Sequence, residues 1–496
     1  MAPRTRFAPS PTGAPHIGHL RTAMYAWLEA KKNGGIFFMR LEDTDQERFV
    51  AGSADVLIDC IKWIGIEPNE GFMGENVPEK GEYGPYVQSK RKDLYKKYAL
   101  ELIEKGAAFY CFCPKQQEVS EVTSNLHDHN CRNLSKEEIE TKLAKGTPYI
   151  IRHKIPLNEH IIIEDMVHGT QKIDTNTLDD SVLLKSDGHA TYHLAHLVDD
   201  HLMKTTHVVR GEEWLPSLPK HTLLFKQAGF EAPKYVHLAL IMIIDKETGT
   251  KRKFSKRKGD PGVIDIMQKG YLPEAVFNYL VFLGWNPGEG ETKEFYTKEE
   301  LINVFDIADC NKSGALFDIE KLNWMNSKYI ANLETNEIYT KIEKYLTKYD
   351  KDFYENIFSK SAKELNIKIL NELKTRLRYL GEYKELTTFI YGEPKERIDL
   401  LLNPKMKIDN IEIVKKGLKL ALDILNSDSL NFSELDNIKN IFVEKIATEG
   451  LKNGQVLWPI RVALSGEEFS PGAFELIYIL GKEKSIQRIQ KIFEKI

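Results

Sequence analysis

The first 45 residues of this 496-residue chain alternate between strand-like and helix-like patterns, and this alternation constrains the fold more than any other feature. A strand-like run over 5–11 ends in a turn rich in Pro and Gly. Apolar residues then recur at helical spacing over 17–28, and a second strand-like run follows over 36–41. This order predicts a βαβ unit with parallel strands and a right-handed crossover. Ligands bind such sheets at the carboxyl ends of the strands, here at 9–19 and 42–45.

The chain is too long for a single hydrophobic core, and its patterns divide it into an α/β domain, an insertion and a helical remainder. Strand-like runs at 206–210 and 236–244 are expected to complete the parallel sheet after the insertion. The predicted segments are 1–104 for the first half of the α/β domain, 105–190 for an α+β insertion, 191–260 for the second half, and 261–325 and 326–496 for two helical parts.

Composition excludes several classes of protein. The longest apolar run, 236–244, is far too short to cross a bilayer, and the first residues lack the pattern of a signal peptide. Five cysteines, an odd number, fit a reducing compartment and argue against a disulfide scaffold. We therefore expect a cytoplasmic protein with no membrane partner. Lys and Arg number 69 and Asp and Glu 73, and the net charge of −4 by itself disfavours a nucleic-acid partner.

The first chemical motif is His16-Ile-Gly-His19, where the first strand passes into the helix. Free N–H groups and the helix dipole favour a phosphate chain at such a helix N-terminus. Gly18 allows a flat ring or a phosphate to approach the backbone closely. On its own the motif fits a polar turn with two exposed histidines equally well.

The second motif is a basic run over 251–258 with a serine, Ser255, between its lysines. On a flexible loop such a run closes over a polyphosphate and neutralises the charge that develops during nucleotidyl transfer. Alone, a basic run is more often a solvated loop or one that faces nucleic acid.

Together the two motifs resemble the paired signature of class I aminoacyl-tRNA synthetases, and further segments resemble the bacterial glutamyl-tRNA synthetase family in order and spacing. These segments are 5–13, 40–45, 85–89, 192–201, 209–214 and 455–466. The resemblance implies a Rossmann-like catalytic domain, an acceptor-stem-binding (connective) insertion at 105–190, a stem-contact helical domain at 261–325 and an all-helical anticodon-binding region at 326–496.

The resemblance also implies an activity, that of an ATP-dependent glutamate–tRNA ligase. Such an enzyme activates L-glutamate with ATP to glutamyl-adenylate, and then transfers glutamate to the 3′-terminal ribose of tRNA-Glu. A non-discriminating member also charges tRNA-Gln. ATP enters with Mg²⁺ as a substrate, tRNA must be bound before glutamate is activated, and the enzyme is expected to be a monomer.

A glutamate pocket needs guanidinium groups for two carboxylates and a carboxylate for the ammonium group. Arg6 and Arg210, each at a strand end, are the natural carboxylate ligands, and Glu42 is placed to hold the ammonium group. The resemblance assigns Arg6, Ser10, Glu42, Tyr192 and Arg210 to glutamate binding. It also places His196 beside the amino acid, where some family members carry Asn.

The resemblance further assigns the residues that act on ATP. His16, Gly18, His19, Glu213, Trp214 and Lys256 are expected at the nucleotide. The catalytic set is expected to be His16, His19, Lys253, Ser255 and Lys256, with Lys256 neutralising the developing pyrophosphate charge. The protein positions the reactants and neutralises charge and performs little covalent chemistry of its own.

Three cysteines in the insertion form a candidate metal site. Cys111, Cys113 and Cys131 supply thiolates of the kind that tetrahedral zinc prefers, and His127 and His129 lie nearby in sequence. Some family members end this site with Cys-x-His, whereas this chain has Cys131-Arg-Asn. The fourth ligand of a structural Zn²⁺ would then be His129, the residue we select, or His127, or be absent, and three reduced cysteines without metal also stay open.

Arg376 and Arg378 are the arginines that we expect to contact the tRNA anticodon, although solvated arginines on an exposed helix face fit the same pattern. A small-molecule nucleotidylyltransferase would not need the glutamate pocket or the long helical tail. A shortened paralogue that modifies a tRNA base would lack the anticodon region. A non-catalytic RNA-binding protein would not need intact His16, His19 and Lys256.

Overall fold

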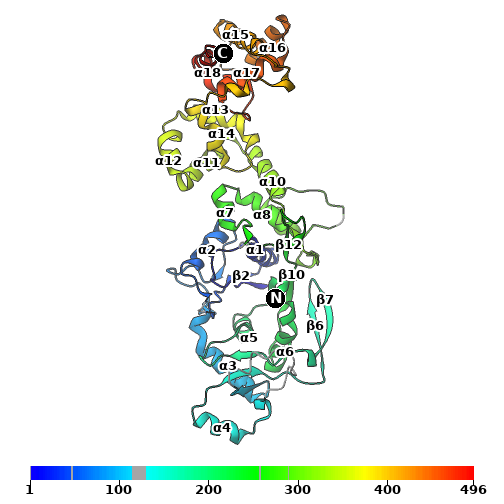
Figure 1. Cartoon of the computed structure of the whole chain (residues 1–496). Helices are drawn as coiled ribbons and strands as arrows, with labels where there is room; N and C mark the ends of the chain where they lie inside the picture. Colours follow the sequence, from blue (N-terminus) through cyan, green and yellow to red (C-terminus); the bar gives the residue numbers. More distant parts are fainter. Residues whose placement is uncertain (1, 46–47, 114–129, 256–257, 289) are drawn as a thin grey trace. The chain divides into compact units, whose positions relative to one another are not determined.

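The computed structural model describes residues 2–45, 48–113, 130–255, 258–288 and 290–496. The chain forms two compact units, which Figure 1 shows coloured along the sequence. The first unit consists of Met1–Ile266 and Pro273–Leu322, and the second of Met267–Leu272 and Asn323–Ile496. Each unit is described below by itself.

The centre of the first unit is a five-stranded parallel sheet in the order β10-β9-β1-β2-β3. Its strands are β1 (Arg4–Phe7), β2 (Ile36–Met39), β3 (Glu70–Gly71), β9 (His207–Gly211) and β10 (Lys234–Leu238). The α/β class and the parallel βαβ unit predicted from the sequence are confirmed. Since β1 and β2 are adjacent and parallel, the segments that follow them share one edge of the sheet.

Helix α1 (Ile17–Lys32) joins β1 to β2, and its ends match the sequence signals. His16 is the N-cap residue, and its ring accepts the backbone N–H of His19. Asn33 ends the helix, and Gly35 then passes so close to Pro3 that an added Cβ would lie 2.0 Å from the Pro3 carbonyl oxygen. The Thr5 hydroxyl donates to the Ala26 carbonyl at 2.7 Å, which fixes α1 against β1.

The strands between β3 and β9 in the chain do not join the central sheet. After α3 (Lys92–Glu104) the chain forms an antiparallel sheet in the order β4-β5-β8 and a separate hairpin of β6 and β7. The bounds are β4 (Ala108–Cys111), α4 (Lys136–Ala144), β5 (Ile150–His153), β6 (His160–Asp165), β7 (Gly169–Asp174) and β8 (Val182–Leu184). The five-segment division predicted from the sequence has no independent test and stays a prediction.

The β6–β7 hairpin packs against the central sheet, beside β10 and α6 (Leu218–Ala228) in Figure 1. Residues along β6 alternate between exposed and buried, as expected for a strand with one covered face. Ile161 and Ile163 share a hydrophobic cluster with Val208 and Tyr235 of the central sheet. The third buried residue of that face is a carboxylate, Asp165.

The prediction of one strand over 236–244 is wrong. The chain leaves the central sheet at Leu238, and β11 (Ile241–Ile244) pairs instead with β12 (Lys251–Lys253) and β13 (Ala315–Leu316) in a small separate sheet. At this junction, side chains bond the backbone groups that a neighbouring strand would otherwise pair with. Arg21 donates to the Ala239 carbonyl, and the Leu240 N–H donates to Glu212 at 2.9 Å.

Helices make up most of the rest of the chain. The first unit also contains α2 (Ser53–Trp63), α5 (Tyr192–Leu202), α8 (Pro273–Val281) and α9 (Lys298–Val304); α7 (Val263–Lys269) and α10 (Ile319–Asn332) cross the boundary between the units. The second unit contains α11 (Thr335–Tyr349), α12 (Lys351–Phe353), α13 (Lys363–Leu373), α14 (Glu382–Tyr391), α15 (Ile411–Asn426), α16 (Leu435–Thr448), α17 (Asn453–Ser465) and α18 (Ala473–Phe493). The predicted helical character after residue 262 is confirmed.

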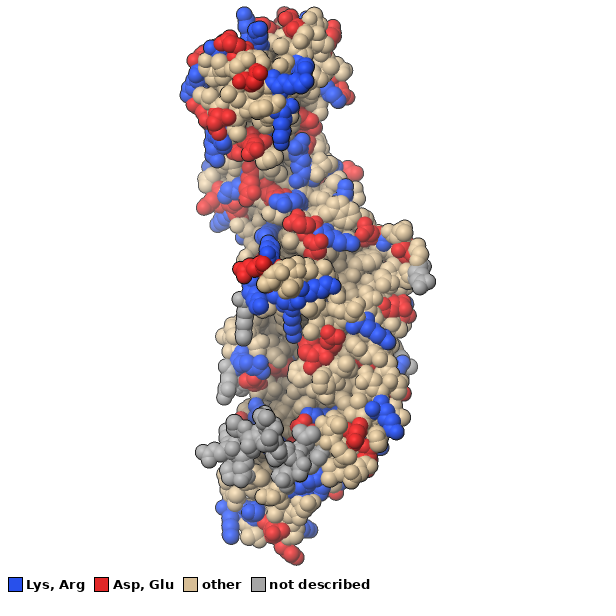
Figure 2. All heavy atoms as spheres, turned by 45° about the vertical axis from the view of Figure 1, so that its right-hand side comes forward, with Lys and Arg blue, Asp and Glu red and all other residues tan. Residues whose placement is uncertain are grey.

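Two surface properties bear on partners. Among the described residues, no helix combines the length and apolar character that crossing a bilayer requires. Lys and Arg side chains are interspersed with Asp and Glu over the face shown in Figure 2. This mixture agrees with the small net charge of −4.

Candidate active site

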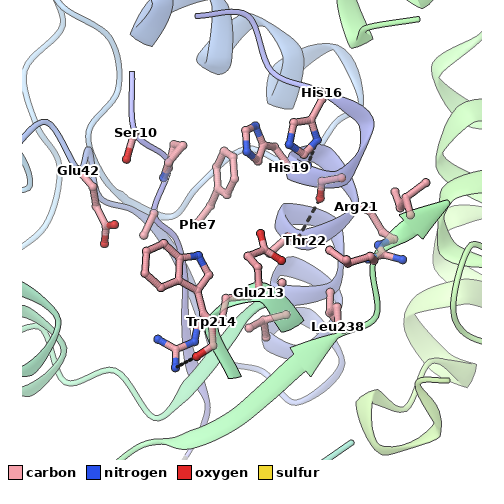
Figure 3. Close-up of a pocket in the computed structure, with 18 of the residues that line it drawn as sticks. Phe7, Ser10, His16, His19, Arg21, Thr22, Glu42, Glu213, Trp214 and Leu238 are labelled. Atoms are coloured by element: carbon pink, nitrogen blue, oxygen red, sulfur yellow. Dashed lines mark hydrogen bonds between the residues drawn. The ribbon is translucent and has the colours of Figure 1, made fainter. Parts of the chain in front are cut away.

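A pocket of about 390 Å³ opens at the carboxyl ends of β1 and β9 and at the start of α1 (Figure 3). The predicted site residues that line it are Arg6, Ser10, His16, Gly18, His19, Glu42, Tyr192, Arg210, Glu213, Trp214 and Lys253. Figure 3 shows Ser10 and Glu42 on one side, His16 and His19 above, and Glu213 and Trp214 between these groups and the sheet. The pocket therefore brings together both predicted motifs and the predicted amino-acid ligands.

Three predicted residues stand apart from this lining. His196 is fully buried and does not line the pocket; its Nδ1 lies 2.6 Å from Asp200 and its Nε2 lies 3.0 Å from the Tyr235 hydroxyl. Ser255 follows β12 but is not among the lining residues. Lys256 lies outside the described residues.

The start of α1 forms one end of the pocket. The rings of His16 and His19 stack with their centroids 3.7 Å apart, and the His19 N–H donates to His16 Nδ1 at 3.3 Å. A Cβ on Gly18 would lie 2.8 Å from Cε1 of His16, so a larger residue would displace that ring. Two imidazoles, a helix N-terminus and no acidic residue in the first turn make this end suited to an anion.

Arg6 and Arg210, both almost fully buried, lie at the other end. Arg6 Nε is 3.2 Å from Asp200, and Arg6 also donates to the Val209 carbonyl at 3.3 Å. Arg210 donates to the Tyr192 hydroxyl at 2.8 Å. Guanidinium groups held this firmly present planar donors to a carboxylate at little further cost in conformational entropy.

Glu42 belongs to a buried charge network with Arg40 and Asp200. Arg40 donates to Glu42 at 3.0 Å and to Asp200 at 2.7 Å. Burial opposes the ionisation of Asp200, but Arg40 and Arg6 hold its pKa well below the usual range. Burial raises the pKa of Glu42 despite Arg40, so the ionised carboxylate gains from a further cation in the pocket.

Buried histidines surround Arg210. Arg210 contacts Nε2 of His237 at 2.9 Å and Nδ1 of His221 at 3.2 Å, and His221 in turn lies 3.0 Å from His193. Burial lowers the pKa of every one of them and brings that of His193 to about 4. These imidazoles are therefore neutral at pH 7 and add no charge beside Arg210.

The basic motif begins on β12 and is fixed by Arg252. Arg252 donates to Asp245 at 2.8 Å and to both carboxylate oxygens of Asp260, at 2.6 and 2.8 Å. Asp260 also accepts the backbone N–H of Ser255 at 2.7 Å. The arginine therefore determines where the loop leaves the strand, while Lys253 on the same strand lines the pocket.

The three cysteines of the insertion lie together. Their Sγ atoms are all within 4.8 Å of one another, and the Cys113 and Cys131 sulfurs are 3.7 Å apart. Burial and the neighbouring thiols raise the pKa of Cys113 to about 12. Three thiols converge here from the end of β4, the residues just after it and the short 130–133 helix, and they fit a zinc donor set, because zinc displaces the thiol protons on binding. His127 and His129 lie outside the described residues.

The predicted tRNA-contacting arginines lie in the second unit. Arg376 donates to the Ser470 carbonyl at 3.3 Å, and Arg378 pairs with Glu382 at 2.6 Å. Both arginines are exposed; Arg376 ends the short helix Lys374–Arg376, and Arg378 follows two residues later. Neither arginine lies near the pocket residues in sequence.

Four residues that fix the lining side chains in place were not predicted from the sequence: Arg40, Asp165, Asp200 and His237. Only one local signal pointed to any of them. Asp199 and Asp200 interrupt the apolar face of α5, and two adjacent buried carboxylates require buried cations. Asp165 and His237 carry no such signal, because their contact joins residues far apart in the sequence.

The fold and the pocket define a class I aminoacyl-tRNA synthetase. Residues 3–324 match the family model described as tRNA synthetases class I (E and Q), catalytic domain, and residues 336–493 match the model of an anticodon binding domain. The predicted fold class is thereby confirmed.

Similar proteins show which family within this class the chain belongs to. The chain is 43% identical to a glutamate–tRNA ligase of Clostridium novyi over 99% of this chain and 98% of that protein, and 44% identical to one of Clostridium botulinum with the same coverage. A crystal structure of a glutamate tRNA ligase from Elizabethkingia meningosepticum, in complex with its amino acid, matches with a TM-score of 0.85 and 34% identity over 100% of this chain and 99% of that one. The chain belongs to the glutamate–tRNA ligase family.

Proposed function

We propose that this chain activates L-glutamate with ATP and transfers it to the 3′-terminal ribose of tRNA-Glu, with the residues of the described pocket in the roles given below. One observation carries the assignment of roles. A single pocket has two buried guanidinium groups and a largely buried carboxylate at one end and a histidine-lined helix N-terminus at the other. This is the arrangement required to hold an acidic amino acid against a polyphosphate.

At the amino-acid end, Arg6 and Arg210 bind the two carboxylates of glutamate, and Glu42 binds its ammonium group. Tyr192 and Ser10 complete this end. Tyr192 already accepts a hydrogen bond from Arg210. His196 is buried and does not line the pocket, so it acts indirectly, through its contact with Asp200. Charge balance then selects glutamate over a neutral amino acid, because an unpaired buried guanidinium would cost several kcal/mol, about 3–5.

At the nucleotide end, His16, His19 and the helix N-terminus bind the phosphates, and Gly18 leaves room for them. Glu213 and Trp214 lie against the nucleotide, and Mg²⁺ enters with ATP. The α-carboxylate of glutamate attacks the α-phosphate, and pyrophosphate leaves with charge that Lys253 and Lys256 neutralise while Ser255 shapes the loop. The ribose hydroxyl of tRNA then attacks the glutamyl carbonyl and AMP leaves.

The tRNA is held by the remaining segments. The insertion at 105–190 binds the acceptor stem, 261–325 contacts the stem, and 326–496 reads the anticodon, with Arg376 and Arg378 as its contacts. We place the enzyme in the cytoplasm as a monomer. Binding relies on local basic groups such as the 251–258 run, since the net charge of −4 gives no general attraction to RNA.

The test is aminoacylation of tRNA-Glu and tRNA-Gln transcripts side by side, with labelled glutamate and ATP. We expect glutamyl-tRNA-Glu from the wild-type protein, and loss of at least about 99% of the rate in His19→Ala with an unchanged Tm. Charging of tRNA-Gln distinguishes a non-discriminating enzyme from a discriminating one. Failure of the wild-type protein to charge cognate tRNA-Glu would refute the proposal.

We also propose that Cys111, Cys113 and Cys131 bind one structural Zn²⁺, with His129 as the fourth ligand. The convergence of their sulfurs within 4.8 Å supports this. Metal analysis of protein purified without chelator should find one zinc per chain, and Cys113→Ser should lose it. His129→Ala tests the fourth ligand, with His127→Ala as its matched control. Well below one zinc per chain would rule the site out.

A further inference from the structure

We infer that Asp165 and His237 are positioning residues for glutamate, because through them the β6–β7 hairpin fixes the guanidinium of Arg210. This inference rests on the proposed function in one respect: it takes Arg210 to be a ligand of a substrate carboxylate. Neither Asp165 nor His237 is a lining residue of the pocket, so neither is expected to touch the substrate.

The contact between Arg210 and His237 follows from the sheet. The two residues are register partners on the parallel strands β9 and β10, and both side chains are buried. Arg210 Nε donates to His237 Nε2 at 2.9 Å. This hydrogen bond orients the plane of the guanidinium, since the Nε–H bond lies in the same plane as Cζ and the two terminal nitrogens.

The hairpin determines which nitrogen of His237 accepts. His237 Nδ1 lies 2.7 Å from Oδ2 of Asp165, and the backbone N–H of His237 reaches the same oxygen at 3.1 Å. A carboxylate only accepts and a guanidinium only donates. His237 must therefore be neutral with its proton on Nδ1, because a proton on Nε2 would place two donors face to face.

Asp165 is itself rigidly held. Its other oxygen, Oδ1, accepts the backbone N–H groups of Val167 and His168 at 2.9 and 2.8 Å, across the turn of the hairpin. The next residue, Met166, donates its N–H to the Tyr235 carbonyl of β10 at 2.9 Å. Burial alone would raise the pKa of Asp165, but these N–H groups and His237 lower it, so the carboxylate stays ionised.

The arrangement leaves Arg210 ready for a ligand. Its Nε is used by His237, and NH1 by Tyr192 and His221; NH2 makes only a 3.5 Å contact with the Trp214 carbonyl. Four of the five N–H donors thus have partners among the described residues, and one on NH2 has none. Since Arg210 lines the pocket, we assign that donor to a glutamate carboxylate.

Two substitutions separate positioning from packing. His237→Gln places an amide oxygen near the position of Nε2, where it accepts from Arg210. His237→Asn places its amide near the position of Nδ1, where it meets Asp165 but leaves Arg210 without an acceptor. His153→Asn is the matched control, because His153 is also fully buried but contacts Gln227, at 2.7 Å, instead of Arg210.

The measurements are KM and kcat for glutamate in aminoacylation, and equilibrium titration of L-glutamate in the presence of tRNA. We expect His237→Asn to raise KM and the dissociation constant at least about tenfold, with a smaller change in kcat. We expect His237→Gln, which keeps the acceptor for Arg210 but loses the Nδ1–H donor to Asp165, to raise KM less than His237→Asn does, and His153→Asn to leave KM unchanged. Equal effects of Gln and Asn at position 237, or an unchanged KM in His237→Asn, would overturn the inference.

A second measurement does not depend on the folding of His237→Asn. Nitrogen-15 NMR of histidine-labelled wild-type protein, assigned with His237→Gln, should show His237 neutral with its proton on Nδ1 at pH 7. A proton on Nε2 or a charged ring would overturn the inference. Wild-type protein that fails to charge tRNA-Glu would refute the proposed function instead, while the titration and the tautomer would still decide the role of His237.

Discussion

Arg40 and Glu42 stand two residues apart beyond the end of β2, and the Arg40 guanidinium donates to the Glu42 carboxylate at 3.0 Å. Arg40 is fully buried and has a second carboxylate partner, Asp200. Glu42 thus shares the Arg40 guanidinium with Asp200, and burial still raises the pKa of Glu42. The residue assigned to the substrate's ammonium group is held in place without being fully neutralised.

Glu42→Gln should therefore lower activity while it keeps or raises stability. An acid whose pKa is raised by folding binds its proton more tightly when folded, so stability is lost as pH rises past the ordinary value of 4.5. Gln cannot ionise and carries no such cost. We expect the Tm of Glu42→Gln at pH 7.5 to equal or exceed that of wild type. Any difference in Tm should be smaller at pH 5. KM for glutamate should rise at least about tenfold. A lower Tm at pH 7.5 would contradict this account.

Buried histidines should make the first unit sensitive to acid. Burial lowers the pKa of His153 and His193 to about 4 and that of His196 to about 3, from an ordinary value of 6.5. Only the unfolded chain takes up these protons between pH 6.5 and 4, so stability falls as pH falls. Each histidine contributes about 1.4 kcal/mol per pH unit in that window. Urea unfolding at pH 7.5, 6 and 5 measures the slope, and His153→Gln should make it shallower; a flat profile would count against neutral buried imidazoles.

Gly18→Ala should impair catalysis without harming the fold. The new Cβ would lie 2.8 and 2.9 Å from two atoms of the His16 ring, which must then leave the N-cap position. The gain of up to about 1 kcal/mol from Ala in place of Gly is offset by a loss of about the same size when the His16 cap is displaced, so the Tm should stay close to that of wild type. We expect kcat/KM for ATP to fall about a hundredfold. KM for glutamate is the internal control, since the amino-acid end is built on other elements, and wild-type kinetics for ATP would refute the prediction.

Asp260→Asn should reproduce most of the effect of Arg252→Ala. Asp260 accepts from both Arg252 and the Ser255 N–H, whereas the bonds of Asp245 among the described residues run to Arg252 and to its own 245–250 turn. We expect kcat to fall about tenfold in Arg252→Ala and Asp260→Asn, and less in Asp245→Asn. Rapid quench of adenylate formation with tRNA present isolates the step. Equal losses in both aspartate variants would show that Asp260 has no special role.

The sequence predicted those parts of the fold that depend on local patterns. The start of α1 at Ile17, its end at Asn33 and the parallel pairing of β1 with β2 follow from apolar spacing and from Gly and Pro. The run over 236–244 was misassigned because apolar content alone carries no mark of a change of sheet. That change depends on Arg21 and Glu212, which are remote in sequence from the junction.

The residues of the site likewise divide into those that local sequence patterns predicted and those that they did not. Many of the residues that line the pocket, from Arg6 to Lys253, fall in motifs and were predicted together, whereas lining residues outside those motifs, such as Arg21 and Arg48, were not predicted. Residues that hold those side chains come from distant segments: Asp165 meets His237 across 72 positions, and Arg40 meets Asp200 across 160. A single sequence shows composition and spacing, and neither records which buried charges are neighbours.

The junction between β10 and β11 has a consequence for the timing of the reaction. Two residues, Ala239 and Leu240, separate the strand that carries His237 from the strand paired with Lys253, and both are tied down by side chains. The separation between the two ends of the pocket is thereby set by the backbone. Under the proposed roles, an amino acid and a nucleotide would meet across that separation, and the backbone would lose little further entropy between binding and bond formation.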